Sequence, residues 1–222
     1  NYLFSIMKSE NLMIIDPSLE IPELESYNKI VLNSPLKTTY HLPAMHSSKT
    51  MDENFPNVKG IILMGSAASV HAPYPWIGDL EKIIKKAIQK QLPILGICFG
   101  HQFLANLFGG KVDVLWQDSK KVGILKVKVL KNNLLIESKE DFLMYSHREG
   151  VTRCPADFNI SAKSSMVNIE GMTHKNLPIW SFQPHIEASK TFSKRIGLTT
   201  SNFKKCESYG TLLLQSFLNK FK

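Results

Sequence analysis

The chain has 222 residues, of which 43% are hydrophobic and 21% are charged, a balance that excludes a disordered, collagen-like or coiled-coil protein. Its net charge is +8, yet the lysines gather on one helical pattern and at the C-terminal end, with no basic run interleaved with aromatic residues. We therefore expect no nucleic-acid partner. The length predicts a single domain over residues 1–222, because no linker-like stretch divides the sequence.

Nothing in the sequence marks the chain for a membrane or for export. No stretch reaches the roughly 18 consecutive apolar residues of a membrane helix. Residues 1–16 lack the basic and apolar regions of a signal peptide. The 3 cysteines are widely spaced and do not form a disulfide framework. We expect a cytoplasmic protein with reduced thiols and no membrane partner.

Short apolar runs in the first half of the chain predict strands. Each run ends at a turn signal, which is typical of strands that are buried on both faces of a sheet. The runs are residues 12–15, 29–32, 60–64 and 93–97. Helical patterns follow the third and fourth runs, the first from Leu80 to Ile88 and the second near Leu104 with an expected end at Gly109. This alternation predicts βαβ units and a parallel sheet.

The other segments are less regular. Residues 35–43 and 46–52 are interpreted as a loop, and residues 212–221 as a final helix. Four short or partly alternating stretches predict mixed or antiparallel strands: residues 121–130, 142–145, 158–162 and 166–169. The expected fold class is therefore α/β, with a mostly parallel, flavodoxin-like central sheet flanked by helices and extended by mixed or antiparallel strands.

The sharpest motif is GICFGHQ at residues 96–102, between an apolar run and a helical pattern. A G-x-C-x-G segment at such a junction holds its cysteine on a strained turn, at the positive end of the helix, which favours the thiolate. The backbone N–H of Phe99 would then face a developing oxyanion. The alternative is that Cys98 is an ordinary buried cysteine.

A thiolate nucleophile needs a base and a group that orients that base. His185 follows a strand-like run that ends at Pro184, and it precedes Glu187 by two positions. In an extended segment, residues two apart project to the same side, so Glu187 could hold the imidazole while it faces Cys98. The alternative is a surface histidine beside a surface glutamate.

Together, GICFGHQ at residues 96–102 and QPHIE at residues 183–187 resemble the motifs of the class I glutamine amidotransferase family. Two further segments agree with that resemblance. GSAASV at residues 65–70 resembles the family's oxyanion loop, and YSHREGV at residues 145–151 resembles its substrate-side segment. The four segments and the strand before them span roughly residues 12–187, which is most of the chain.

The resemblance implies a role for each matched residue. Cys98 would be the nucleophile, His185 the general base and acid, and Glu187 the carboxylate that orients it. The oxyanion hole would consist of the backbone N–H groups of Phe99 and of Gly65 or Ser66. The α-amino and α-carboxylate ends of the substrate would be held by Gln102, Ser146 and His147. We expect no metal and no cofactor at this site.

The implied reaction is hydrolysis of the glutamine side-chain amide through a γ-glutamyl thioester on Cys98, with ammonia passed to an unknown acceptor. The family often pairs this activity with a synthetase subunit, so a synthetase partner is possible. The sequence departs from the family at two places. Ile186 stands where the family has proline, and Ser66 and Ala67 replace the second glycine and the proline of the oxyanion loop.

Two alternatives stay open. A γ-glutamyl peptidase or hydrolase would use the same thioester to release groups larger than ammonia, and it would need a more open pocket. A non-catalytic regulatory subunit would keep the fold and lose turnover, which the two departures from the family motifs make a real alternative.

Overall fold

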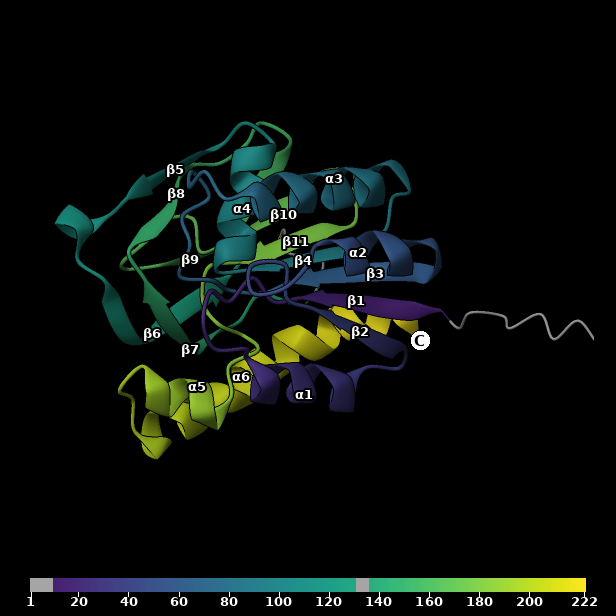
Figure 1. The fold of residues 1–222 in the computed structure, drawn as a ribbon. Helices are drawn as coiled ribbons and strands as arrows, with labels where there is room; N and C mark the ends of the chain where they lie inside the picture. Colours follow the sequence, from purple (N-terminus) through teal and green to yellow (C-terminus); the bar gives the residue numbers. More distant parts are fainter. Residues whose placement is uncertain (1–9, 131–135) are drawn as a thin grey trace, which may run out of the picture.

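The computed structural model describes residues 10–130 and 136–222. Residues 1–9, on which the expectation of no signal peptide partly rests, lie outside the described residues. In the described part of the chain, one sheet has nine strands in the order β2-β1-β3-β4-β11-β10-β9-β6-β7, and a second sheet pairs β5 with β8. The large sheet runs through the middle of the molecule with helices on both faces (Figure 1).

The first five strands of the large sheet are parallel to one another. They are β2 (Lys37–His41), β1 (Asn11–Ile15), β3 (Val58–Leu63), β4 (Ile94–Ile97) and β11 (Ile179–Phe182). Because they are parallel, their carboxyl ends meet at one edge of the sheet, where open α/β sheets bind ligands.

The rest of the large sheet is antiparallel. It contains β10 (Gly171–His174), β9 (Phe158–Ser164), β6 (Lys121–Val129) and β7 (Glu140–His147). The small sheet pairs β5 (Lys111–Val114) with β8 (Glu149–Arg153). The expected α/β fold class, with a parallel sheet extended by antiparallel strands, is confirmed.

Helices form a layer on each face of the sheet (Figure 1). One layer contains α2 (Lys49–Asn54), α3 (Pro75–Gln89) and α4 (Phe99–Leu107). The other contains α1 (Leu24–Asn33) and α6 (Thr200–Leu218), with α5 (Lys190–Arg195) beside them. Short 3₁₀ helices cover Phe55–Asn57, Trp116–Asp118 and Asn219–Phe221.

Each helical layer packs on its own hydrophobic core. Successive residues of β1 point to opposite faces, so Met13 and Ile15 join the core under α3 and α4, while Leu12 and Ile14 join the core under α6. All four are fully buried. A strand that is buried on both faces gives a continuous apolar run, which is why this strand could be predicted.

The prediction of a strand at residues 29–32 is wrong, because this segment lies in α1. Only Ile30 of the apolar run is fully buried, whereas Leu32 is 85% exposed. A strand in the middle of the sheet would bury the whole run, whereas a helix buries one side chain and turns the next ones to the solvent.

Three other predictions need correction. The segments 35–43 and 46–52 are not one loop, because they contain β2 and α2. β2 is an edge strand whose residues are mostly half-buried, so it lacks a long apolar run. Residues 166–169 form bends and irregular backbone, and the strand there is β10, which starts at Gly171. The final helix begins at Thr200, well before residue 212.

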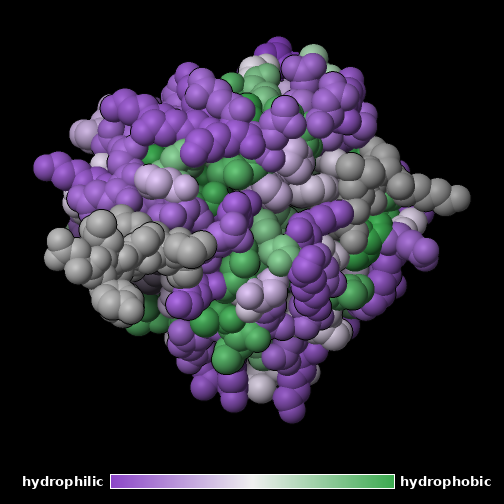
Figure 2. Space-filling view, turned by 90° about the vertical axis from the view of Figure 1, so that its right-hand side faces the viewer, coloured by the Kyte–Doolittle hydropathy of each residue, from purple (hydrophilic) through white to green (hydrophobic). Residues whose placement is uncertain are grey.

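The side of the molecule at which β1 begins is shown in Figure 2. Hydrophilic side chains cover most of the visible face, and hydrophobic ones gather in smaller patches between them. Among the residues that the structure describes, no helix has the length and apolar character needed to cross a membrane.

Candidate active site

The turn between β4 and α4 holds Cys98 in an unusual backbone conformation. Its φ is 52° and its ψ is −103°, a region that non-glycine residues rarely adopt. The backbone N–H of Cys98 donates a hydrogen bond to the carbonyl oxygen of Phe182 in β11, at 2.8 Å. Gly100 allows the turn to pack closely, since a Cβ atom there would collide with the carbonyl oxygen of Leu63. The expected strand–turn–helix geometry is therefore present.

Helix α4 begins at Phe99, directly after Cys98. The first N–H groups of a helix have no acceptor inside it, and the helix dipole makes this end positive. The side chain of Phe99 is fully buried, with its ring 5.7 Å from that of Trp76 and 6.0 Å from that of Phe103. This packing fixes the position of Phe99, the first residue of α4, directly after Cys98.

His185 and Glu187 are in direct contact. Nδ1 of His185 donates to Oε1 of Glu187 at 2.9 Å, and both side chains are buried. The expected reason for this contact is wrong, because residues 185–187 lie in a turn beyond β11 and not in an extended segment. The turn nevertheless brings the two side chains to the same side.

Electrostatics favour a charged imidazole at position 185. Burial alone would lower the pKa of His185, but the adjacent Cys98 and Glu187 overcome it and raise the pKa to about 10. The interaction with Cys98 is the largest of the effects that raise this pKa. The thiol, imidazole and carboxylate thus form a chain of three interacting groups, despite a separation of more than 80 residues along the sequence.

Gly65 lies against both Cys98 and His185. A Cβ atom at position 65 would lie 2.7 Å from Cε1 of His185 and 3.4 Å from Cβ of Cys98. The next residue, Ser66, donates from Oγ to the carbonyl oxygen of Pro17 at 2.7 Å and accepts from the N–H of Ala68 at 3.0 Å. The loop after β3 is thereby held beside the thiol.

A pair of buried glutamines lies beneath Cys98. Nε2 of Gln183 donates to Sγ of Cys98 at 3.7 Å. Oε1 of Gln183 accepts from Nε2 of Gln102 at 3.2 Å, and the same Nε2 donates to the carbonyl oxygen of Glu149 at 2.7 Å. The amide nitrogen of Gln102 is thus engaged within the protein. Gln183 belongs to the motif at residues 183–187, but the sequence predicted no role for it.

Ser146 and His147 end strand β7 close to His185. Nδ1 of His147 hydrogen-bonds to the carbonyl oxygen of Glu149 at 2.8 Å, so Nδ1 carries the proton. Nε2 of His147 is buried and has no hydrogen-bond partner among the described residues. Burial lowers the pKa of His147 to about 4. His147 therefore presents an uncharged, unprotonated nitrogen at neutral pH.

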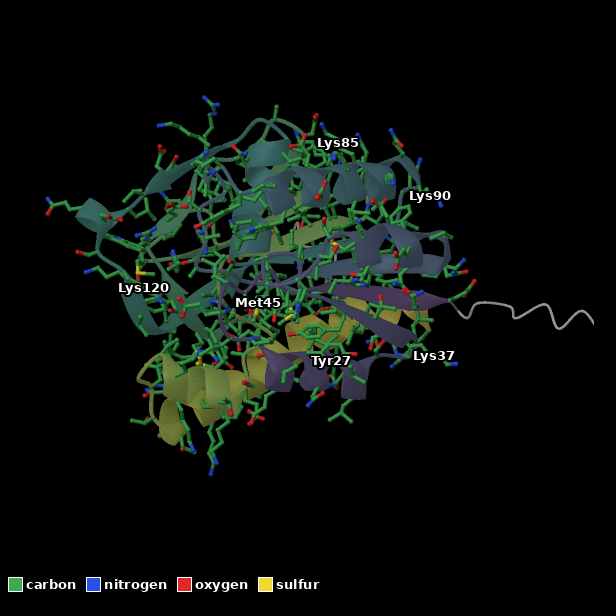
Figure 3. The ribbon with its side chains drawn as sticks, viewed as in Figure 1. Tyr27, Lys37, Met45, Lys85, Lys90 and Lys120 are labelled. Carbon is green, nitrogen blue, oxygen red and sulfur yellow. The ribbon has the colours of Figure 1, made fainter. Side chains whose placement is uncertain are left out.

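These residues surround one cavity of about 550 Å³. All of the sequence-predicted site residues line it except Phe99, whose side chain is in the core. Lys120, which also lines the cavity, lies at the opposite end of the molecule from Lys37 and Lys90 (Figure 3). The cavity is therefore at the edge of the sheet where the parallel strands end.

Part of the cavity wall was not predicted. It includes residues 18–21 and Glu23 after β1, and Phe192, Arg195 and Ile196 from α5 and the residue after it. Arg195 forms an ion pair with Glu23 and so joins the two parts of the wall. The signal that could have found residues 18–23 is their position after the carboxyl end of a parallel strand.

Asp16 organises this wall. Its carboxylate accepts hydrogen bonds from the N–H of Ser18 at 2.9 Å, the N–H of Glu23 at 2.7 Å and the hydroxyl of Tyr40 at 2.5 Å. Burial raises the pKa of Asp16, and the hydrogen bonds oppose that shift.

No group of three His, Cys, Asp or Glu side chains that could hold a metal ion is found in residues 10–130 and 136–222.

Known proteins resemble this chain in sequence. The family model for glutamine amidotransferase class I matches residues 22–200. A glutamine-hydrolyzing GMP synthase subunit from Methanosphaera stadtmanae is 36% identical over 156 residues, which are 69% of this chain and 77% of that protein. The protein of the same name from Methanocaldococcus jannaschii is 36% identical over 141 residues, which are 63% of this chain and 70% of that protein.

Solved structures show the same fold. A glutamine amidotransferase from Thermotoga maritima has a TM-score of 0.77 and 18% identity, covering 95% of this chain and 97% of that chain. A glutamine amidotransferase from Methylobacillus flagellatus has a TM-score of 0.72 and 14% identity, covering 96% of this chain and 94% of that chain. With the family model matching residues 22–200, the chain belongs to the class I glutamine amidotransferase family.

Proposed function

We propose that the protein hydrolyses the side-chain amide of glutamine through a thioester on Cys98 and supplies the ammonia to a synthetase partner. The observation that carries this proposal is the contact of Cys98 with the His185–Glu187 pair at the wall of a single cavity. A nucleophile, a base and an orienting carboxylate in contact are the parts that acyl transfer needs.

In the first half of the reaction, the Cys98 thiolate attacks the amide carbon Cδ of glutamine. The amide oxygen becomes an oxyanion that accepts hydrogen bonds from the backbone N–H groups of Phe99 and of Gly65 or Ser66. One such donor is typically worth about 3–4 kcal/mol. His185 then gives its proton to the amide nitrogen, and the C–N bond breaks. Ammonia departs, and the γ-glutamyl group remains on Cys98 as a thioester.

In the second half, a water molecule gives a proton to the now neutral His185 and attacks the thioester carbon. The C–S bond breaks, glutamate is released, and the thiolate–imidazolium pair is restored. Glu187 keeps the imidazole in one orientation through both halves. Gln102, Ser146 and His147 hold the α-amino and α-carboxylate ends of the substrate in this proposal.

The synthetase partner is proposed from the names of the relatives. Those relatives are named as subunits of a glutamine-hydrolyzing GMP synthase, so each is one part of a larger enzyme. We propose that this chain likewise works with a separate synthetase subunit, and that the acceptor of its ammonia is bound there. The sequence contains no G-x-x-x-x-G-K-[Ser/Thr] motif with which the chain could hold a nucleotide phosphate itself.

The test is release of glutamate from glutamine by the purified protein and by Cys98→Ala. We expect the wild type to turn over and the variant to lose nearly all activity. Labelling of the wild type with 6-diazo-5-oxo-norleucine, located by mass spectrometry, should modify Cys98. If the wild type neither turns over nor labels, alone or together with a synthetase, the protein is a non-catalytic regulatory subunit.

A second candidate is a γ-glutamyl peptidase or hydrolase, which the size of the cavity favours. Its volume of about 550 Å³ falls in the range of sites that hold drug-sized ligands, so a γ-glutamyl dipeptide has room. The ratio of kcat/KM for glutamine to that for γ-glutamylalanine separates the two functions. A ratio above one supports the glutaminase, and a ratio well below one supports the peptidase.

A further inference from the structure

Lys29 on α1 holds the turn that carries the His185–Glu187 pair. Its Nζ donates hydrogen bonds to the carbonyl oxygens of Ile186 and Ala188, both at 3.3 Å. These two residues flank Glu187 in the sequence. A single ammonium group from a helix more than 150 residues away therefore fixes the backbone on both sides of the carboxylate.

The ammonium of Lys29 lies behind the pair and outside the substrate cavity. A small separate cavity of about 10 Å³ is lined by Lys29, His185 and Glu207, among others. Lys29 does not line the large cavity, whereas His185 lines both. A change at Lys29 should consequently reach the reaction through the pair and not through contact with glutamine.

Two carboxylates lie near the ammonium of Lys29. Burial lowers the pKa of Lys29, and the nearby Glu187 and Glu207 oppose that shift. Glu187 also interacts with the carboxylate of Asp16, which has the same charge. Oε2 of Glu187 is buried without a hydrogen-bond partner among the described residues. A cation at this place stabilises the negative charge of Glu187 against Asp16 and against burial.

We propose that Lys29 is a positioning residue for the thiol–imidazole–carboxylate chain: it anchors residues 186–188 and places a positive charge behind Glu187. The inference rests on the proposed role of Cys98, His185 and Glu187. Without that charge, the buried carboxylate of Glu187 faces Asp16 with no cation behind it, and its position beside His185 is less stable. The support that Glu187 gives to the His185 imidazolium then weakens, and the Cys98 thiolate loses its partner.

The test follows alkylation of Cys98 by iodoacetamide between pH 5 and 9, with mass spectrometry of the peptide to separate Cys98 from Cys154 and Cys206. In Lys29→Gln, which keeps a donor for the carbonyls but loses the charge, we expect the pH of half-maximal rate to rise by about one unit. At a pH below both midpoints that is about a tenfold slower reaction. Lys29→Arg, which keeps the charge, should stay within about twofold of the wild type.

Lys29→Met provides a second uncharged variant, and Lys37→Met is the matched control. Lys37 is exposed in β2, at the end of the molecule away from the cavity (Figure 3). Its removal should leave the alkylation profile unchanged. If Lys29→Gln has the wild-type midpoint or a lower one, the inference is overturned. If Lys29→Met does not fold, the Gln and Arg variants still show whether Lys29 acts through its charge or only through its hydrogen bonds to the turn.

Turnover gives a second readout. Because Lys29 does not touch the large cavity, Lys29→Gln should lower kcat for glutamine while KM stays within about twofold. The midpoint of the acid limb in the pH profile of kcat should shift to higher pH by the same amount as the alkylation midpoint. A rise in KM with unchanged kcat would contradict the inference. Alkylation needs no substrate, so a wild type that fails to hydrolyse glutamine removes the proposed function and leaves the test of Lys29 intact.

Discussion

The α-carbon of Gly65 packs so closely against the ring of His185 that a side-chain carbon at position 65 would lie 2.7 Å from Cε1. Side-chain carbons do not approach this closely in proteins, so either the imidazole or the loop after β3 would have to move. Cys98 bounds the same space, with its Cβ at 3.4 Å from that position. The glycine thus sets the distance between the loop after β3 and the imidazole of His185.

Gly65→Ala should therefore lower glutamine turnover by about 100-fold, because displacement of a catalytic group by about 1 Å has an effect of this size. The control is Gly78→Ala in α3, where an added Cβ would meet nothing within 4 Å. That variant should keep wild-type turnover and gain about 0.5–1 kcal/mol of stability from helix propensity. Wild-type kcat in Gly65→Ala would show that the base does not depend on this contact.

Replacement of the Glu187 carboxylate by an amide should impair the base. In Glu187→Gln, the Nδ1–H of His185 keeps an oxygen acceptor but loses the negative charge that helps to raise the pKa of His185 to about 10. We expect kcat/KM to fall between about 100-fold and 10,000-fold, as when an orienting carboxylate is lost from other catalytic triads. Steady-state kinetics from pH 5.5 to 9 measures this loss.

Glu53→Gln, an exposed carboxylate of α2, is the control for the loss of charge. It should behave as the wild type at every pH. A Glu187→Gln protein that retained more than about a third of wild-type kcat/KM would mean that the carboxylate only fills space beside the imidazole. The melting temperatures of both variants should be recorded, so that partial unfolding is not mistaken for a catalytic effect.

The unprotonated Nε2 of His147 should bind an N–H donor of the substrate. This atom is buried and lacks a hydrogen-bond partner among the described residues, and His147 is one of the residues that line the large cavity. His147→Ala should raise the KM for glutamine about tenfold, since a lost hydrogen bond to a charged donor is worth about 1.5–3 kcal/mol. His46→Ala, a residue outside the cavity, should leave KM unchanged. An equal KM in both variants would assign His147 a purely structural role.

The parts of the site that could be predicted from the sequence depend on local patterns. The buried runs at β1, β3 and β4 are continuous because both faces of these strands are covered. The motif at residues 96–102 carries its own turn and helix start, so Cys98 could be placed before any contact was known. The contact between His185 and Glu187 was also expected, but from an extended segment, whereas a turn provides it.

Other parts depend on contacts that no local pattern contains. The segment of α1 that includes Lys29 was interpreted as a strand, so its contact with the turn after β11 could not be foreseen. Asp16 directly follows the apolar run at residues 12–15 and the sequence predicted no role for it, yet its carboxylate orders the cavity wall by accepting hydrogen bonds from residues up to Tyr40. Such contacts arise from the order of strands in the sheet, which brings the ends of β1, β3, β4 and β11 together.

Glu170 gives a prediction about stability that is independent of catalysis. It precedes β10, is 1% exposed, and its backbone carbonyl accepts from the N–H of Gln183 at 2.8 Å. Burial raises the pKa of Glu170 to about 7, although Oγ of Ser164 donates to its Oε1 at 2.6 Å. The folded protein therefore holds this proton between about pH 4.5 and 7, where the unfolded chain has lost it.

Because the folded state binds the extra proton, the free energy of unfolding must fall as pH rises through this window, by up to about 3 kcal/mol from this group alone. Glu170→Gln keeps an oxygen for Ser164 and has no proton to lose. Urea unfolding at pH 4.5 and at pH 8 should show the two proteins nearly equal at the lower pH and the variant more stable at the higher one. If the difference between the proteins is the same at both values, folding does not raise the pKa of Glu170.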